Sequence, residues 1–70
     1  MKGPVQNTVY AMRMKHGLTQ EELASRVRVS RQTIISIEKG NYTPSVHLAL
    51  ELARVFRVPV EKLFILTHAK

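Results

Sequence analysis

The sequence predicts an all-α domain built from five short helices. Turn-forming residues divide the chain into short blocks, and apolar residues repeat at helical spacing within each block. Serine, threonine or proline stands before several of these blocks, where such residues favour the start of a helix. A chain of 70 residues has room for one compact core and not for two. We therefore expect a single domain over residues 1–70.

The first two helices have clear end signals. The first is predicted over Asn7–His16, and Gly17 after it readily takes the left-handed conformation that ends a helix. The second begins after Thr19, and Glu22 three positions later completes a capping box. Its predicted inward face consists of Leu23, Ala24 and Val27.

The third helix is predicted from its N-cap Ser30 to Lys39, and Gly40 stops it. Only Arg28 and Val29 separate it from the second helix. The spacing of these signals leaves no room for a longer loop between the two helices.

This third helix has two different faces. Ile34 and Ile37 are three positions apart and are predicted to face the core. The opposite side is mainly polar and carries Arg31, Gln32, Ile35, Ser36 and Lys39. In a helical domain of any function, such a face is usually no more than solvated surface.

The remainder of the chain is predicted to form two further helices. Ser45 caps a fourth helix, and its core-facing residues are Leu48, Leu52, Ala53 and Phe56. A fifth helix follows Pro59 and is predicted over Val60–Leu66.

The formal net charge of +6 is spread along the chain, with +3, +1 and +2 on residues 1–18, 19–44 and 45–70. A basic protein of this kind favours a polyanion as its partner, and its charge equally suits an anionic membrane surface. No apolar run approaches the roughly 20 residues of a membrane span, and no signal peptide is recognisable. We therefore expect a cytoplasmic protein that does not insert into a membrane.

Residues for catalysis or metal binding do not form a recognisable set. The chain has no cysteine, and no catalytic triad, phosphate-binding glycine loop or carboxylate pair can be assembled. His16, His47 and His68 lack the spacing of metal ligands. We expect no enzymatic activity, no metal, no cofactor and no small-molecule ligand.

The segment QEELASRVRVSRQTIISIEKGNYTPS, which begins at Gln20, closely resembles the helix-turn-helix of the Xre family, which includes the lambdoid phage repressors and Cro proteins. Ala24 matches the small residue at the helix crossing, and the apolar motif positions are Leu23, Val27, Val29, Ile34 and Ile37. The motif spans Gln20–Lys39, and the likeness covers roughly residues 7–66. It implies a lambda-repressor-like fold and a transcriptional regulator that binds double-stranded DNA with its third helix in the major groove. Several very short members of the family add terminal strands, so the resemblance also implies a small antiparallel ribbon that pairs Val5–Asn7 with Phe64–Thr67.

The resemblance also implies roles for individual side chains. Arg31, Gln32 and Ser36 match base-reading positions, and arginine pairs well with guanine and glutamine with adenine. Ile35 stands where relatives often carry a polar residue, and it either meets a thymine methyl group or remains partly covered surface. The expected phosphate contacts are Gln20, Arg28, Ser30, Thr33, Lys39, Asn41 and Tyr42.

Two departures and one pair complete the comparison with the family. The family usually has glycine at the positions of Arg28 and Arg57, and both sites are expected to need a positive φ. A residue other than glycine costs roughly 1 kcal/mol or more there, so arginine indicates either a tolerated turn or a gain from its charge. Arg13 and Glu38 match a family pair and are expected to form a structural salt bridge between the first and third helices.

Residues 60–67 hold more apolar surface than one core requires, so we expect this segment to pair two chains. The residues expected in the interface are Val60, Leu63, Phe64, Ile65 and Leu66. Such a homodimer places two recognition helices about 34 Å apart on an inverted-repeat operator, with repression as the default outcome. One rival interpretation is an antitoxin or protein-interaction module of the same fold. A second, a peripheral membrane binder, needs a basic polar face that the fifth helix lacks.

Overall fold

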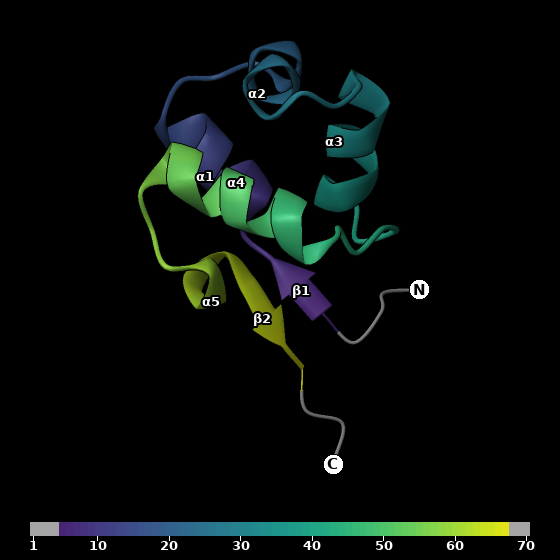
Figure 1. Ribbon diagram of the computed structural model, residues 1–70, viewed down its shortest axis with the longest axis vertical. Coiled ribbons are helices and arrows are strands. Elements are labelled where there is room, and N and C mark those ends of the chain that lie inside the picture. The colour runs from purple at the N-terminus through teal and green to yellow at the C-terminus, as the bar shows by residue number, and fades with distance from the viewer. Residues whose placement is uncertain (1–4, 68–70) are drawn as a thin grey trace.

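The computed structural model describes residues 5–67, which form five helices and a ribbon of two short strands (Figure 1). In chain order the elements are β1 Val5–Asn7, α1 Val9–Lys15, α2 Gln20–Val27, α3 Arg31–Glu38, α4 Val46–Phe56, α5 Val60–Leu63 and β2 Phe64–Leu66. Helix α4 crosses the middle of the molecule, with α2 above it, α3 to its right and α5 and the ribbon below (Figure 1). The predicted mainly helical, lambda-repressor-like fold is confirmed.

The helix starts follow the predicted capping residues. Thr19 and Glu22 form both hydrogen bonds of the capping box, since Thr19 Oγ1 accepts from the Glu22 amide at 3.0 Å and the Thr19 amide donates to the Glu22 carboxylate at 2.8 Å. Ser30 and Ser45 accept from the amides three positions later, at 3.2 and 3.1 Å. Each cap fixes where its helix begins, and therefore which residues turn inward.

Two predicted helix boundaries were wrong, and the strands explain both. The first helix begins at Val9 and not at Asn7, because Asn7 belongs to β1 and its Oδ1 accepts a hydrogen bond from the Val9 amide at 3.0 Å. The fifth helix ends at Leu63 and not at Leu66, because residues 64–66 form β2. The alternative prediction of a ribbon is confirmed: β1 and β2 are antiparallel, with Val5 opposite Leu66 and Asn7 opposite Phe64.

The core lies where α2, α3 and α4 meet above α5. Its completely covered side chains are Val9, Leu23, Ile34, Ile37, Leu52 and Leu63, and Phe56 is 2% exposed. Every residue predicted on the inward faces of α2, α3 and α4 is buried. This apolar contact holds α3 on the outside of the domain with one face covered and the other turned away from the core.

No helix within residues 5–67 is long and apolar enough to cross a membrane. The same part of the chain contains no cluster of histidine, aspartate or glutamate side chains that could hold a metal ion. His68, one of the three histidines considered above, lies outside the described residues.

Candidate nucleic-acid interface

Helices α2 and α3 are locked together by small and branched apolar side chains. Ala24 on α2 is 3% exposed, and Ile34 and Ile37 on α3 are completely covered. Between the helices, Arg28 and Val29 make the tight predicted turn, and the Val29 amide donates to the Ala24 carbonyl at 3.0 Å. The turn and the packing together fix the rotation of α3 about its own axis.

The side of α3 opposite the two buried isoleucines lies at the surface. Arg31, Gln32 and Lys39 are exposed, whereas Ile35 and Ser36 are half-buried. A helix turns by about 100° per residue, which puts Gln32 and Lys39 nearest the middle of this face, Ile35 and Ser36 to either side of them, and Arg31 at one margin. The face therefore combines hydrogen-bonding groups with one apolar side chain.

A shallow hollow along one margin of this face collects several of the predicted contacts. It is lined by Ser30, Gln32, Thr33, Ser36, Asn41 and Tyr42. Ser30 Oγ caps the start of α3 by accepting from the Thr33 amide, and it lies 3.0 Å from Thr33 Oγ1, with which it forms a second hydrogen bond. The structure thus brings Gln32 and Ser36 together with Tyr42 of the α3–α4 loop.

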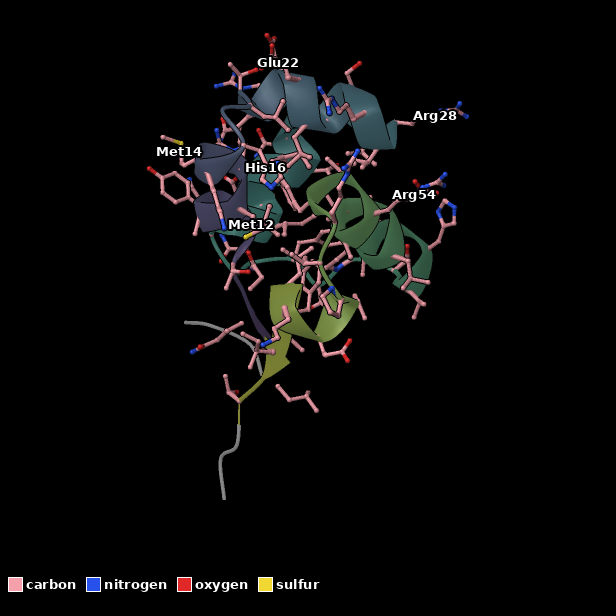
Figure 2. The ribbon with its side chains drawn as sticks, turned by 90° about the vertical axis from the view of Figure 1, so that its left-hand side faces the viewer. Met12, Met14, His16, Glu22, Arg28 and Arg54 are labelled. Atoms are coloured by element: carbon pink, nitrogen blue, oxygen red, sulfur yellow. The ribbon has the colours of Figure 1, made fainter. Side chains whose placement is uncertain are left out.

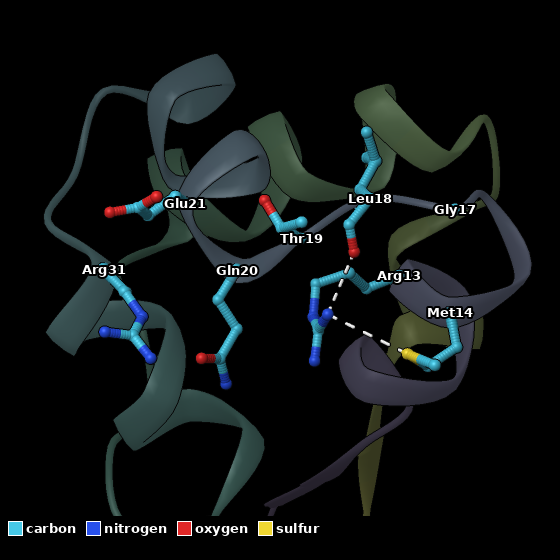
Figure 3. A pocket seen from close by; sticks show the side chains of 8 residues that line it. All are labelled: Arg13, Met14, Gly17, Leu18, Thr19, Gln20, Glu21 and Arg31. Carbon is cyan, nitrogen blue, oxygen red and sulfur yellow. Dashed lines mark hydrogen bonds between the residues drawn. The ribbon is translucent and has the colours of Figure 1, made fainter.

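Arg31 lines a different hollow, which lies between α1, the start of α2 and the start of α3 (Figure 3). The side chains that line this cleft are Arg13, Met14, Gly17, Leu18, Thr19, Gln20, Glu21 and Arg31. In Figure 3, Arg31, Gln20 and Arg13 enter it from α3, α2 and α1. The predicted contacts therefore fall into two groups, with Arg31 and Gln20 on one flank and Gln32 and Tyr42 on the other.

A buried ion pair lies next to this cleft, and one of its partners, Arg13, lines the cleft. Arg13 Nε donates to Glu38 Oε2 at 2.6 Å and Arg13 Nη2 donates to Glu38 Oε1 at 3.2 Å, and both side chains are less than a tenth exposed. The bidentate contact joins α1 to α3, as the sequence predicted. The hydrogen bond to Glu38 raises the pKa of Arg13 and outweighs the lowering by burial, so Arg13 remains a cation.

The same ion pair holds two further groups. Arg13 Nη1 donates to the Leu18 carbonyl at 2.9 Å, which fixes the approach to α2. Gln20 Nε2 donates to Glu38 Oε1 at 3.2 Å. Sequence reasoning missed this link between Gln20 and Glu38, since the two residues are 18 positions apart and only the folded helices bring them together.

Asn7 is a second residue that sequence reasoning missed. Its Nδ2 donates to the Ile37 carbonyl at 2.8 Å, and this carbonyl lies in the last turn of α3. Asn7 precedes the N-cap Thr8, and its Oδ1 accepts from the Val9 amide, but the sequence holds no signal for the contact with α3. The ribbon is thereby tied to the end of the helix that carries the predicted base-reading residues.

Arg28 and Arg57 have the unusual backbone that the sequence predicted for them. Their φ angles are +62° and +60°, and they are the only residues other than glycine within residues 5–67 with a positive φ. Arg28 ends α2 beside the turn, and Arg57 ends α4 on the side of the molecule away from α3 (Figure 1). Both arginine side chains are exposed.

The C-terminal segment is only in part available to a partner. Leu63 is completely covered by its own chain, so its expected place in a dimer interface was wrong. Val60 and Phe64 are half-buried against the same core. Ile65 and Leu66 are 43% and 68% exposed. Counting apolar residues overstated the surplus, because Leu63 is needed to complete the single-chain core.

The helix-turn-helix family model HTH_3 matches residues 9–63, which include all five helices. An "uncharacterized HTH-type transcriptional regulator" of Archaeoglobus fulgidus is 57% identical over 53 residues, which cover 76% of each chain. Another protein of this description from Methanocaldococcus jannaschii is 51% identical over 61 residues, covering 87% of this chain and 92% of the relative.

Two further similarities are more distant. The cryptic phage CTXphi transcriptional repressor RstR of Vibrio cholerae is 33% identical over 52 residues, which cover 74% of this chain and 47% of RstR. The crystal structure of a putative DNA-binding protein from Bacteroides fragilis superposes with a TM-score of 0.78 at 20% identity, covering 86% of this chain and 97% of that one. This last likeness concerns the fold alone.

Proposed function

This chain belongs to the helix-turn-helix family of DNA-binding transcriptional regulators, and we propose that it acts as a homodimer that represses transcription from an inverted-repeat operator. The observation that carries the proposal is the division of α3 into two faces. Ile34 and Ile37 are completely covered, and the opposite side presents polar groups to the outside. The major groove is about 12 Å wide and admits a helix with such a face.

We assign the reading of base edges to Arg31, Gln32, Ile35 and Ser36. An arginine can donate two hydrogen bonds to one guanine, and a glutamine can donate to and accept from adenine. Ile35, the apolar residue of this face, is suited to the methyl group of thymine. Because Arg31 and Gln32 line hollows on opposite flanks of α3, we expect them to read different base pairs.

These four residues on the outer side of α3 form what we call the reading face. Phosphate contacts are proposed on both of its flanks. Gln20 serves one strand beside the start of α2, where the helix dipole favours an anion. Asn41 and Tyr42 serve the other strand, beyond the end of α3. The remaining proposed phosphate contacts are Arg28, Ser30, Thr33 and Lys39.

The proposed dimer forms through the C-terminal part of the chain, within residues 60–67. Ile65 and Leu66 are its main apolar contacts, with smaller contributions from the exposed parts of Val60 and Phe64. The sheet formed by the described residues has two strands, so each strand also has an outer edge at which a strand of a second copy can pair. The similarity to RstR, a repressor by name, supports repression as the outcome of binding.

Selection of binding sites from a pool of random duplexes tests this function with the full chain. We expect enrichment of an inverted repeat whose half-sites lie one helical turn apart, and an affinity that falls steeply with salt. A reporter placed behind the selected site should lose expression when the protein is present. Enrichment of no sequence, or an affinity insensitive to salt, would contradict the proposal.

A further inference from the structure

A second groove lies next to the reading face, on the side of the α2–α3 turn. The α2–α3 turn, the α3–α4 loop and the outer side of α4 form its walls. Its lining residues are Arg26, Val27, Arg28, Val29, Tyr42, Ser45, His47, Leu48, Glu51 and Arg54. No role assigned so far uses α4, whose outer face supplies one wall of this groove.

The groove is strongly cationic. Arg28 and Arg54 lie on the same side of the molecule (Figure 2), and within residues 5–67 neither forms an ion pair. The single carboxylate in the groove, that of Glu51, lies 3.7 Å from His47 Nε2. Arg26 also borders a neighbouring hollow that contains two glutamates, so its charge is partly opposed. With three arginines against one carboxylate, the groove carries a net charge of +2 when histidine is counted as neutral.

The backbone of Arg28 gives a second reason to regard its charge as useful. At a φ of +62° a side chain other than glycine costs roughly 1 kcal/mol or more, and glycine would fill the turn without this cost. An arginine in this position extends a long cationic side chain from the turn into the groove. The site therefore gives up some stability for a charge.

The groove is continuous with the surface proposed to contact DNA. Tyr42 lines both this groove and the hollow that contains Gln32 and Ser36. A duplex that lies along α3 has its sugar-phosphate backbone beside the α3–α4 loop, which leads directly into the groove. Phosphates are therefore the anions nearest to these arginines in the bound state.

We propose that this groove binds the DNA backbone beyond the base pairs read by α3, with Arg28 and Arg54 each neutralising one phosphate. The proposal rests on the proposed function, and it adds Arg54 and the outer side of α4 to the DNA-binding surface. Because phosphate contacts are independent of sequence, the groove increases affinity and salt dependence and leaves the preferred operator unchanged.

The test compares two double variants of the full chain that lose the same charge. Arg28→Gly with Arg54→Gln removes the groove cations, and Arg57→Gly with Lys15→Gln removes two exposed cations outside both the groove and the proposed dimer segment. Both contain one glycine substitution at a positive φ, so their backbone effects are matched. The dissociation constant for a 30-base-pair duplex of mixed sequence is measured between about 50 and 300 mM KCl.

The groove variant is expected to lower the slope of log K against log salt by about 2, which corresponds to about 30-fold weaker binding near 0.15 M salt. The control variant should keep a slope close to the original.

Equal weakening in both variants overturns the proposal, because the loss of net charge alone then explains the weaker binding. Wild-type affinity in the groove variant also overturns it, even if a poly-glutamate peptide binds the groove. A wild-type chain that binds no duplex refutes the proposed function as well, so the two failures are distinguishable.

Discussion

Arg31 and Gln32 are neighbours in the sequence, yet they line hollows on opposite flanks of α3. A rotation of about 100° per residue separates them. Arg31 lies with Gln20, whose amide is held by Glu38, whereas Gln32 lies with Ser36 and the α3–α4 loop. At the scale of single residues, the reading face therefore has two different environments.

Replacing Gln32 by alanine should relax the choice of one base pair without unfolding the protein. Gln32 is exposed, so its loss leaves no cavity, and the expected loss of discrimination is about 1–3 kcal/mol at the position it reads. Site selection with Gln32→Ala and with the exposed Ser25→Ala on α2 measures the effect. An unchanged base preference in the first variant would remove Gln32 from the reading face.

The ion pair between Arg13 and Glu38 should behave differently when one partner or both are replaced. Glu38→Gln leaves a nearly covered guanidinium without its counter-charge, and we expect a loss of about 3–5 kcal/mol. Arg13→Met with Glu38→Leu removes both charges and should recover most of that stability. Chemical denaturation of the three proteins gives the comparison, and a double variant no better than Glu38→Gln would contradict it.

At the scale of elements, the sequence predicted the helices better than the chain ends. Thr19 and Ser30 act on amides three positions away, so the information that sets these helix starts is local. The strands depend on pairing between the two ends of the chain, which competes with helix formation at Phe64. Periodicity cannot decide this competition, because it carries no information on long-range pairing.

In the candidate site, too, the features set by local sequence were predicted and those set by long-range contacts were not. The two faces of α3 and the positive φ of Arg28 follow from spacing and from the resemblance to relatives. The links from Gln20 to Glu38 and from Asn7 to Ile37 could not be foreseen. Their partners are 18 and 30 positions apart in the sequence, and only folding brings them together. The burial of Leu63 was missed because apolarity does not distinguish core from interface.

Near the end of α4, the same substitution of arginine by glycine can be tested at a residue with a positive φ and at a residue within the helix. Arg57→Gly relieves a positive φ and should raise stability by up to about 1 kcal/mol after the greater freedom of the unfolded glycine is counted. Arg54→Gly, three positions earlier and within the helix, should lower stability by about 0.5–1 kcal/mol. Thermal unfolding followed by circular dichroism measures both, and changes of the same sign would contradict this explanation.

At the scale of the whole molecule, the proposed dimer separates the surface that pairs two chains from the surface that meets DNA. The ribbon lies at the lower end of the domain, and α3 stands at its side (Figure 1). Asn7 joins the two regions through its hydrogen bond to the Ile37 carbonyl. A contact between ribbons therefore also fixes the spacing of two recognition helices.

Leu66→Glu should convert the protein to monomers and weaken operator binding more than binding to a half-site. A glutamate in an apolar interface loses hydration without gaining a partner. Leu50→Glu is a suitable control, since Leu50 is 52% exposed on α4 and lies outside residues 60–67. Sedimentation velocity at micromolar concentration distinguishes the species. If Leu66→Glu remained dimeric and Leu50→Glu did not, the interface would lie on α4.

The pairing of β1 with β2 also has a consequence for the order of folding. The partners Val5 and Leu66 stand almost a whole chain length apart, so their contact closes a far longer loop than any turn between the helices. Loop closure becomes entropically less favourable with length, and local helices form within about a microsecond. We expect the helices to dock first and the ribbon to close last. Its edge then becomes available for pairing only on molecules whose core is already complete, which limits mispairing between partly folded chains.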